Sequence, residues 1–248
     1  MQVLWSVFVV RTQRINPLLP AGISFGYTNL MQQDVTNSSL QDAPPDSRPP
    51  RHTPAFEIVR DAPTEDEAFL DWLATKSKED GKYELSRGQV TRMHAWVQRS
   101  HAIMCTNIMA ILLTSLDRSK FHISTADFGV KTPVGTRFPD VMVEPVGGKF
   151  KERVSRNPIF ITEVLSPSTT DVDFLEKAPE YMGIASLQTY LICSPDEPCV
   201  WVYRRGPSGW NTKPERIIND LAALIPLGGL DISLPVTEIY RGFNFTDD

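Results

Sequence analysis

Two carboxylic acids and one lysine in the middle of the chain are of the types that bind a divalent cation and assist hydrolysis. Asp140 opens one short apolar run, Glu163 lies near the end of another, and Lys177 follows. Carboxylate oxygens suit Mg²⁺ or Mn²⁺, which retain several waters and take further ligands from a phosphate. Such a cation lowers the pKa of its bound water and neutralises charge on a phosphodiester, while an ammonium group orients the attacking water or stabilises that charge. These residues could therefore form a site for phosphodiester hydrolysis.

The segments around the two carboxylic acids predict a hairpin that brings them together. Residues 140–144 and 159–165 are rich in Val and Ile, and a loop containing Gly147 and Gly148 joins them. If the two strands pair antiparallel, the start of the first lies beside the end of the second. Lys177 lies on a following helix that must fold back from that end, and Pro179 should bend this helix or end its first segment early.

Each of these residues also has an ordinary structural explanation. A Pro-Asp pair before a strand is a common turn, a glutamate at a strand end is commonly solvated, and a helical lysine usually lies at the surface. Glu84 on an earlier predicted strand is either a third carboxylate near the cation or a polar residue facing water. The pattern alone leaves these alternatives open.

Other polar residues could contribute, and each has a structural alternative. His101, in a long predicted helix, is either a catalytic base or a hydrogen-bonded packing residue. Ser166 and Thr169 could contact phosphate at a helix N-terminus, or they form a turn and a cap. Cys105 has no arranged partner in the sequence, so we do not expect a thiol nucleophile. Basic residues could contact phosphates or be solvated surface: Lys149, Lys151, Arg153, Arg156, Arg204 and Arg205.

The elements that must position these residues alternate between helices and short strands. A capping-box pattern, Thr64 with Glu67, predicts a helix over residues 65–75, and apolar periodicity predicts a long buried helix over 96–116. The predicted strands cover residues 83–85, 89–93, 121–124, 128–130, 189–193, 199–204 and 230–234, with a turn of helix at 236–240. This order predicts a mixed sheet flanked by helices, an α/β or α+β fold.

Composition places the chain among ordinary globular proteins. Of the 248 residues, 41% are hydrophobic and 22% charged, and the net charge of −5 argues against a broad basic surface. The three cysteines are too few and too irregular for a disulfide framework, so we expect a reducing, cytoplasmic setting. No run is long enough to span a membrane. We expect a flexible extension over residues 1–60, in which Met1–Val10 could be a short strand, a domain over 61–243 and a short tail over 244–248.

Several motifs in order resemble one known family. They are Tyr-Glu-Leu-x-x-Gly at 83–88, the helix with His101, Asp-Phe-Gly-Val at 127–130, Pro-Asp-Val at 139–141, Glu-Val-Leu-Ser-Pro-Ser-Thr at 163–169, Lys177-x-x-x-Tyr181 and Ser-Leu-Gln-Thr-Tyr at 186–190. Over about residues 64–240 the chain resembles the Uma-two family of restriction-endonuclease-like proteins, part of the PD-(D/E)XK nuclease superfamily. The resemblance implies the restriction endonuclease-like fold and a divalent-metal site made by Asp140 and Glu163.

The resemblance also implies roles for two further residues. The superfamily lysine normally stands two residues after the glutamate, where this chain has Leu165, so Lys177 would be its functional equivalent. Glu84 matches an acidic position of the family and would be an extra ligand or a water-orienting group. We therefore expect a Mg²⁺- or Mn²⁺-dependent endonuclease acting on DNA, with dimerisation compatible with cutting two strands. The alternative is a nuclease-fold protein that does not cleave and serves as a nucleic-acid-binding or regulatory module.

Overall fold

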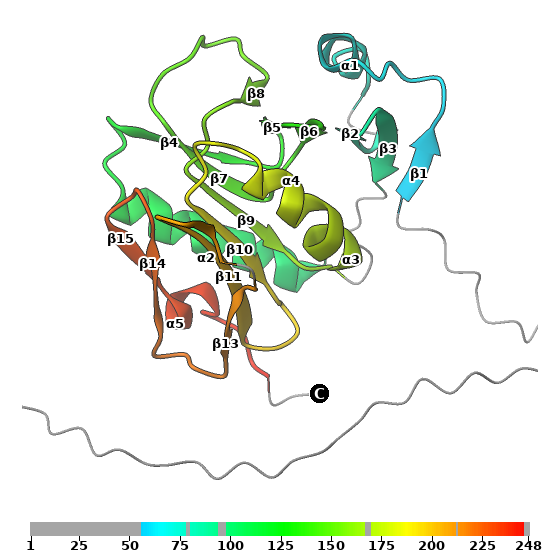
Figure 1. The fold of residues 1–248 in the computed structure, drawn as a ribbon. Helices are drawn as coiled ribbons and strands as arrows, with labels where there is room; N and C mark the ends of the chain where they lie inside the picture. The colour runs from blue at the N-terminus through cyan, green and yellow to red at the C-terminus, as the bar shows by residue number, and fades with distance from the viewer. Residues whose placement is uncertain (1–55, 78–79, 94–97, 167–169, 212, 246–248) are drawn as a thin grey trace, which may run out of the picture. The chain divides into compact units, whose positions relative to one another are not determined.

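The computed structural model describes residues 56–77, 80–93, 98–166, 170–211 and 213–245 (Figure 1). All of them fall in a unit that spans residues 51–248. Most of the predicted extension, including the possible strand at Met1–Val10, therefore lies outside the described residues.

The larger sheet is mixed, as predicted, and contains the hairpin with the two carboxylic acids. Its strand order is β12-β11-β10-β9-β7-β4, and β13 also pairs with β11. β9 and β10 are parallel, whereas β7 with β9 and β10 with β11 are antiparallel. The strands are β4 (Phe121–Thr125), β7 (Val141–Pro145), β9 (Phe160–Val164), β10 (Thr189–Cys193), β11 (Cys199–Gly206), β12 (Gly209–Trp210) and β13 (Glu215–Ile218).

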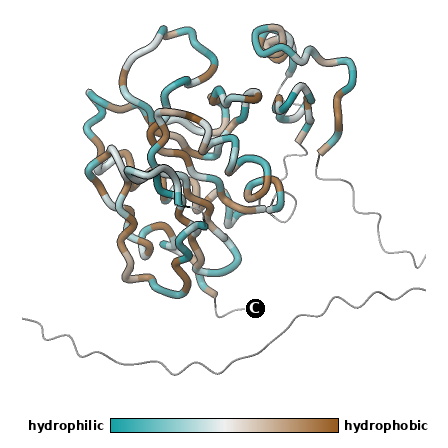
Figure 2. The backbone as a smooth tube through the Cα atoms, in the orientation of Figure 1, coloured by the Kyte–Doolittle hydropathy of each residue, from teal (hydrophilic) through white to brown (hydrophobic). Residues whose placement is uncertain are grey.

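Helices cover both faces of this sheet, so its central strands are buried on both sides. Every residue of β9 and β10 is buried, as expected for strands with helices above and below. On one face, α2 (Arg99–Ser115) packs Met104, Ile108 and Leu112 against Val143 and Phe160. Figure 2 shows hydrophobic segments running through this sheet. A β-hairpin and a short helix complete that side: β14 (Leu224–Leu227), β15 (Ile232–Pro235) and α5 (Val236–Ile239).

The opposite face is covered by a helical segment whose winding changes at a proline. It consists of α3 (Thr170–Val172), the π-helix η2 (Asp173–Lys177) and α4 (Ala178–Met182). The Ala178 N–H donates to the carbonyl of Asp173, five residues back. Pro179 has no N–H, and its ring excludes the carbonyl four residues earlier, which explains a wider turn just before it. The expectation that Pro179 would interrupt a regular helix is confirmed.

A second sheet, packed with its own small core, contributes the remaining site residues. Its strand order is β1-β3-β2-β6-β5-β8, and α1 (Asp66–Leu73) packs Phe69 and Leu70 with Tyr83, Leu85 and Val90. A β-carbon on Gly135 would overlap the carbonyl of Leu85, so glycine permits β6 to approach β2. The strands are β1 (Phe56–Val59), β2 (Lys82–Ser86), β3 (Gln89–Met93), β5 (Gly129–Thr132), β6 (Gly135–Arg137) and β8 (Val154–Ser155).

The structure confirms most predicted elements, adds strands that were not predicted (β6, β8, β12, β13 and β14) and corrects two details. Regular structure begins earlier than predicted, because β1 pairs antiparallel with β3 although residues 56–59 were assigned to the flexible extension. Residues 56–59 read Phe-Glu-Ile-Val, which suits a strand, but they are mostly exposed and follow a proline-rich stretch. The predicted capping box is also absent: the N-cap of α1 is Glu65, and its side chain makes no capping hydrogen bond. The β2–β3 turn has Arg87 and Gly88 at positive φ (48° and 72°), as a two-residue hairpin turn requires.

Candidate metal centre

The β7–β9 hairpin places Asp140 beside Glu163, as the sequence predicted. Val141 pairs with Thr162, so Asp140, one residue before β7, lies next to Glu163 near the end of β9. The Asp140 N–H donates to Glu163 Oε2 at 3.3 Å, and the Val164 N–H donates to Asp140 Oδ2 at 2.8 Å. The two carboxyl groups therefore meet at one end of the larger sheet.

Lys177 reaches the same place from the helical segment over the sheet and is not a surface residue. Its Nζ lies 3.0 Å from Glu163 Oε1 and 3.0 Å from Asp173 Oδ1. Tyr181 also donates to Glu163 Oε1, at 2.8 Å. The side chains of Glu163 and Lys177 are 3% and 6% exposed. The η2 winding thus presents Asp173 and Lys177 toward β9 together with Tyr181 of α4.

Glu84 belongs to the same buried cluster, but both of its oxygens are engaged by the protein. Oε2 accepts from Arg137 Nη1 at 2.9 Å, and Oε1 accepts from the Phe138 N–H at 3.2 Å. Through these bonds Glu84 holds the segment that leads into Asp140. The described contacts do not bring Glu84 to Asp140 itself.

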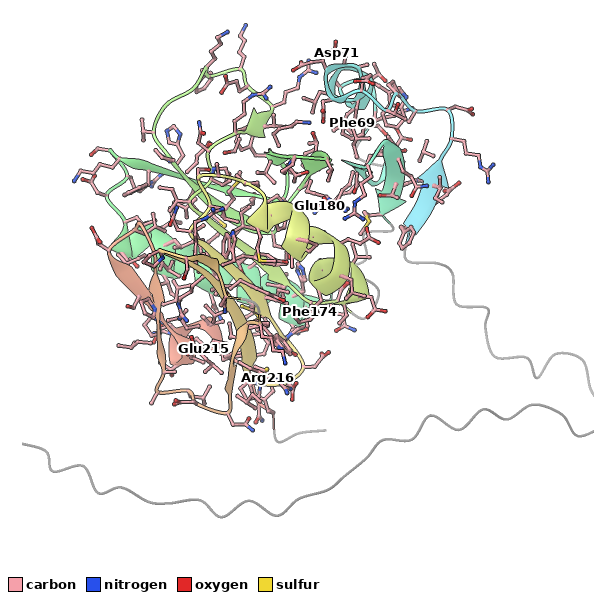
Figure 3. All side chains as sticks on the ribbon, in the orientation of Figure 1. Phe69, Asp71, Phe174, Glu180, Glu215 and Arg216 are labelled. Atoms are coloured by element: carbon pink, nitrogen blue, oxygen red, sulfur yellow. The ribbon has the colours of Figure 1, made fainter. Side chains whose placement is uncertain are left out.

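Arg137 links this segment to the helix above it. Its Nε and Nη2 donate to the two oxygens of Glu180 at 2.8 and 2.9 Å. Glu180 also accepts from Ser86 of β2, and Figure 3 shows it on α4. Arg137 was not singled out as a site residue from the sequence, although it stands three positions before Asp140.

The buried cluster holds more acidic groups than basic ones. Among the described residues, the buried acidic and basic side chains are four carboxylic acids (Glu84, Glu163, Asp173 and Glu180) and two cations (Arg137 and Lys177). Asp140 adds a fifth carboxyl group at the rim, with a side chain 14% exposed. Since uncompensated buried charge is costly, such a site favours either a bound proton or a bound cation.

The pKa values of Glu163 and Asp140 reflect this excess of buried carboxyl groups over cations. Burial, reinforced by Asp140, Asp173 and Glu84, raises the pKa of Glu163 to about 8 despite the opposing charge of Lys177. Burial also acts to raise the pKa of Asp140, but the hydrogen bond and charge of His101, together with Lys177, outweigh it and lower this pKa. Without a cation Glu163 is therefore the carboxyl group that retains a proton, whereas Asp140 is ionised.

The donor set fits a hard divalent cation. In the described hydrogen bonds Asp140 uses only Oδ2, and Glu163 Oε2 accepts only the long bond from the Asp140 N–H. Asp140 Oδ1 and a lone pair of Glu163 Oε2 are thus free of protein hydrogen bonds within the described part of the chain. Two carboxylate oxygens with the remaining positions filled by water are the coordination that Mg²⁺ accepts.

His101 and Cys105 of α2 approach Asp140 from the other face of the sheet. His101 Nε2 lies 3.1 Å from Asp140 Oδ2, and Cys105 Sγ lies 3.6 Å from His101 Nδ1. The expectation that Cys105 has no partner was wrong, because His101 stands four residues before it and residues four apart share one helix face. Burial and the charges of Asp140 and Glu163 raise the pKa of the Cys105 thiol well above its usual range. A metal-free thiolate nucleophile is therefore not favoured here, as expected.

The other candidate residues are engaged elsewhere or lie at the surface. Arg153 donates to the carbonyl of Leu70 at 2.7 Å and pairs with Asp71, which lies on α1 (Figure 3). Arg205 donates to the carbonyls of Leu187, Met182 and Ile184. The Ser166 carbonyl accepts from the Thr170 hydroxyl, and Thr169 lies outside the described residues.

No helix in the described part of the chain has the length and apolarity needed to cross a membrane.

Known proteins resemble this chain in sequence and fold. The uncharacterized protein slr1290 of Synechocystis is 26% identical over 200 residues, covering 78% of this chain and 98% of the relative. A crystal structure from Anabaena variabilis, titled a "putative nuclease belonging to DUF820", aligns with a TM-score of 0.56 at 15% identity. It covers 69% of this chain and 96% of that one. At this low identity the likeness shows a common fold, and the predicted restriction endonuclease-like fold is confirmed.

A family comparison covers the region that contains the site. Residues 66–237 match the family Uma2, described as "Putative restriction endonuclease". The matched region includes Glu84, Asp140, Glu163 and Lys177. The chain therefore belongs to the Uma2 (Uma-two) family.

Proposed function

We propose that this chain is a metal-dependent nuclease that hydrolyses phosphodiester bonds in DNA at the Asp140–Glu163 site. The observation that carries the proposal is the buried excess of carboxyl groups at the sheet end where Asp140 and Glu163 meet. A divalent cation would offset this excess, and membership of the Uma2 family supports nuclease chemistry.

Asp140 and Glu163 would hold Mg²⁺ or Mn²⁺ through Asp140 Oδ1 and Glu163 Oε2. When bound, the ion supplies a water of lowered pKa and offsets charge on the phosphodiester. Glu163 gives up its proton when it becomes a ligand, because only the carboxylate coordinates. Tyr181, which donates to Oε1, leaves Oε2 directed toward Asp140.

Lys177 and Glu84 have supporting roles in this proposal. Lys177 stabilises the Glu163 carboxylate and, with a shift of its ammonium group, orients the attacking water or contacts the phosphate. Asp173 retains the lysine in its charged form, since its oxygen lies 3.0 Å from Nζ. Glu84 supports the site by fixing the backbone before Asp140 through the Phe138 N–H, so we assign it a positioning role rather than a ligand role.

A local basic loop offers contacts for the nucleic-acid backbone. The loop between β7 and β8 carries Lys149 and Lys151 on either side of Phe150, whose side chain is fully exposed. By topology this loop lies at the opposite end of β7 from Asp140, about 17 Å away for a five-residue strand. Exposed aromatic and basic side chains together suit phosphate contact and base stacking. Such local contacts are needed because the chain as a whole is acidic.

One observation favours the second candidate, a nuclease-fold module that binds without cleaving. Glu163 and Lys177 are nearly completely buried and bonded to each other. A substrate phosphate can reach them only after a shift of the covering helical segment. In the binding-module case the same cluster would serve stability, and nucleic acid would bind elsewhere on the surface.

A cleavage assay separates the two functions. The purified chain is incubated with plasmid and with single-stranded DNA in Mg²⁺ or Mn²⁺, beside Glu163→Ala, Glu163→Gln and a sample with EDTA. The nuclease proposal predicts cleavage only by the unsubstituted chain and only with a divalent cation. Cleavage that survives both substitutions, or no cleavage in any condition, would contradict it, and DNA binding without cleavage would favour the module.

A further inference from the structure

A second group of potential metal ligands lies on the α2 side of Asp140. His101, Cys105 and Asp140 each place one nitrogen, sulfur or oxygen atom within 4.8 Å of the other two. In the described part of the chain this is the one group of three such side chains within that mutual reach. It requires neither Glu163 nor Lys177.

The positions of two of the three ligands follow from the helix that carries them. His101 and Cys105 are four residues apart on α2, a spacing that puts both side chains on the same helix face. Met104 and Ile108 of the same helix are fully buried against the sheet, which sets how α2 is rotated. Asp140 comes from the start of β7, and the Val164 N–H holds its Oδ2 in place.

The distance between His101 Nε2 and Asp140 Oδ2 is close to that between two ligand atoms of a tetrahedral zinc ion. Bonds of about 2.0 Å to nitrogen or oxygen and about 2.3 Å to sulfur put neighbouring ligand atoms roughly 3.3–3.7 Å apart. His101 Nε2 is already 3.1 Å from Asp140 Oδ2. Cys105 Sγ lies 3.6 Å from the other ring nitrogen, Nδ1. Because the three ligand atoms lie within 4.8 Å of one another, a rotation of the cysteine side chain toward Nε2 and Asp140 would complete the three-ligand set.

The site is also accessible enough for an ion to enter. The side chains of His101 and Asp140 are 12% and 14% exposed, and Cys105 is partly exposed. A water molecule can therefore occupy the fourth position, as in zinc sites with three protein ligands. By contrast, Cys193 and Cys199 are buried in the sheet.

We propose that His101, Cys105 and Asp140 bind a thiolate-preferring divalent cation of the zinc class, with water as the fourth ligand. The ligand set decides the class of ion, because sulfur and imidazole suit Zn²⁺ and disfavour Mg²⁺, which takes oxygen ligands. Binding here does not depend on hydrolysis by the chain. If the proposed nuclease function is also correct, a zinc-class ion would inhibit it, since Asp140 is common to both sites.

Cobalt provides a direct probe, because a Co²⁺–thiolate bond gives a charge-transfer absorption in the near ultraviolet. The full chain, treated with EDTA, desalted and kept reduced with a phosphine, is titrated with Co²⁺. We expect this band to saturate at one ion per chain and to disappear when an equivalent of Zn²⁺ is added. Excess Mg²⁺ should leave it in place.

Substitutions identify the ligands and separate this site from the proposed hydrolytic one. Cys105→Ser should remove the band, and His101→Ala should weaken binding by at least about tenfold. Cys199→Ala, the matched control, should leave it unchanged, as should Glu163→Gln. Circular dichroism and thermal unfolding confirm that each variant is folded.

The proposal is overturned if the unsubstituted chain gives no sulfur band, if the band survives Cys105→Ser, or if it is lost in Cys199→Ala. Failure of the nuclease proposal looks different: DNA is not cleaved while the cobalt band remains. A band lost only in Glu163→Gln would place the ion at the other site and would also contradict the inference.

Discussion

Replacing Glu163 with glutamine should make the metal-free protein more stable than the unsubstituted chain at about pH 8. The reason is the pKa of Glu163, which burial raises from its ordinary value of 4.5 to about 8. At pH values between these two pKa values, Glu163 keeps its proton in the folded chain and releases it in the unfolded chain. The folded state then binds more protons, so the free energy of unfolding falls as the pH rises through this window. Because glutamine does not titrate, Glu163→Gln removes this pH-dependent change in the free energy of unfolding.

The size of the effect follows from the single proton involved. One proton of difference changes the free energy of unfolding by about 1.4 kcal/mol per pH unit. From about pH 5.5 to about pH 7.5 the free energy of unfolding of the unsubstituted chain should thus fall by up to about 3 kcal/mol more than that of the variant. At the lower pH the two should differ little, because glutamine resembles the protonated acid and its amide oxygen can still accept from Tyr181.

Urea unfolding in EDTA at a series of pH values measures this difference. The carboxylic acids whose pKa values are lowered, Glu84 and Asp140, are ionised in both states across the window and add little slope. Glu57→Gln, on an exposed strand, is the matched control and should follow the unsubstituted chain. Equal pH slopes for Glu163→Gln and the unsubstituted chain would refute the reasoning.

Three further substitutions test the buried cluster, each measured by urea unfolding near neutral pH. Lys177→Met leaves Asp173 without its cation and Glu163 without its lysine donor and should cost about 3–5 kcal/mol; a loss under about 1 kcal/mol would contradict the described pairing. Arg137→Met should cost a similar amount because it leaves the buried carboxylates of Glu84 and Glu180 without their shared cation. Arg153→Met is the control: its partner Asp71 is exposed, so the lost ion pair should cost under about 1 kcal/mol. Equal losses would refute the distinction. Gly135→Ala should cost about 1–3 kcal/mol or more by forcing β6 away from the Leu85 carbonyl, and an unchanged midpoint would show that the strands can separate.

The elements that local patterns encode could be predicted from the sequence. Runs rich in Val and Ile identified β7 and β9, and strand direction alone placed Asp140 near Glu163. The strand β1 was missed because it has only four residues and follows a proline-rich stretch, although its sequence Phe-Glu-Ile-Val suits a strand. The π-helical turn before Pro179 could be predicted only as an interruption, since its position depends on packing against β9 and β10.

The contacts among distant residues could not be predicted from the sequence. Arg137 joins Glu84 to Glu180 across the β2–β6 pairing, which no local pattern encodes. Pattern alone would have left Lys177 as a surface lysine, and only the family resemblance indicated its role. By contrast, the His101–Cys105 contact could have been predicted, because the two residues are four positions apart on one predicted helix.

Calorimetric titration with Mg²⁺ tests the central claim most directly, because a hard cation should use the Asp140–Glu163 pair and avoid the sulfur of Cys105. We expect one ion per chain for the unsubstituted protein at about pH 8, with binding lost in both Asp140→Asn and Glu163→Gln and kept in Cys105→Ser. Mg²⁺ binding that persists in Asp140→Asn and Glu163→Gln, or that is absent from the unsubstituted chain, would contradict a metal centre at this site.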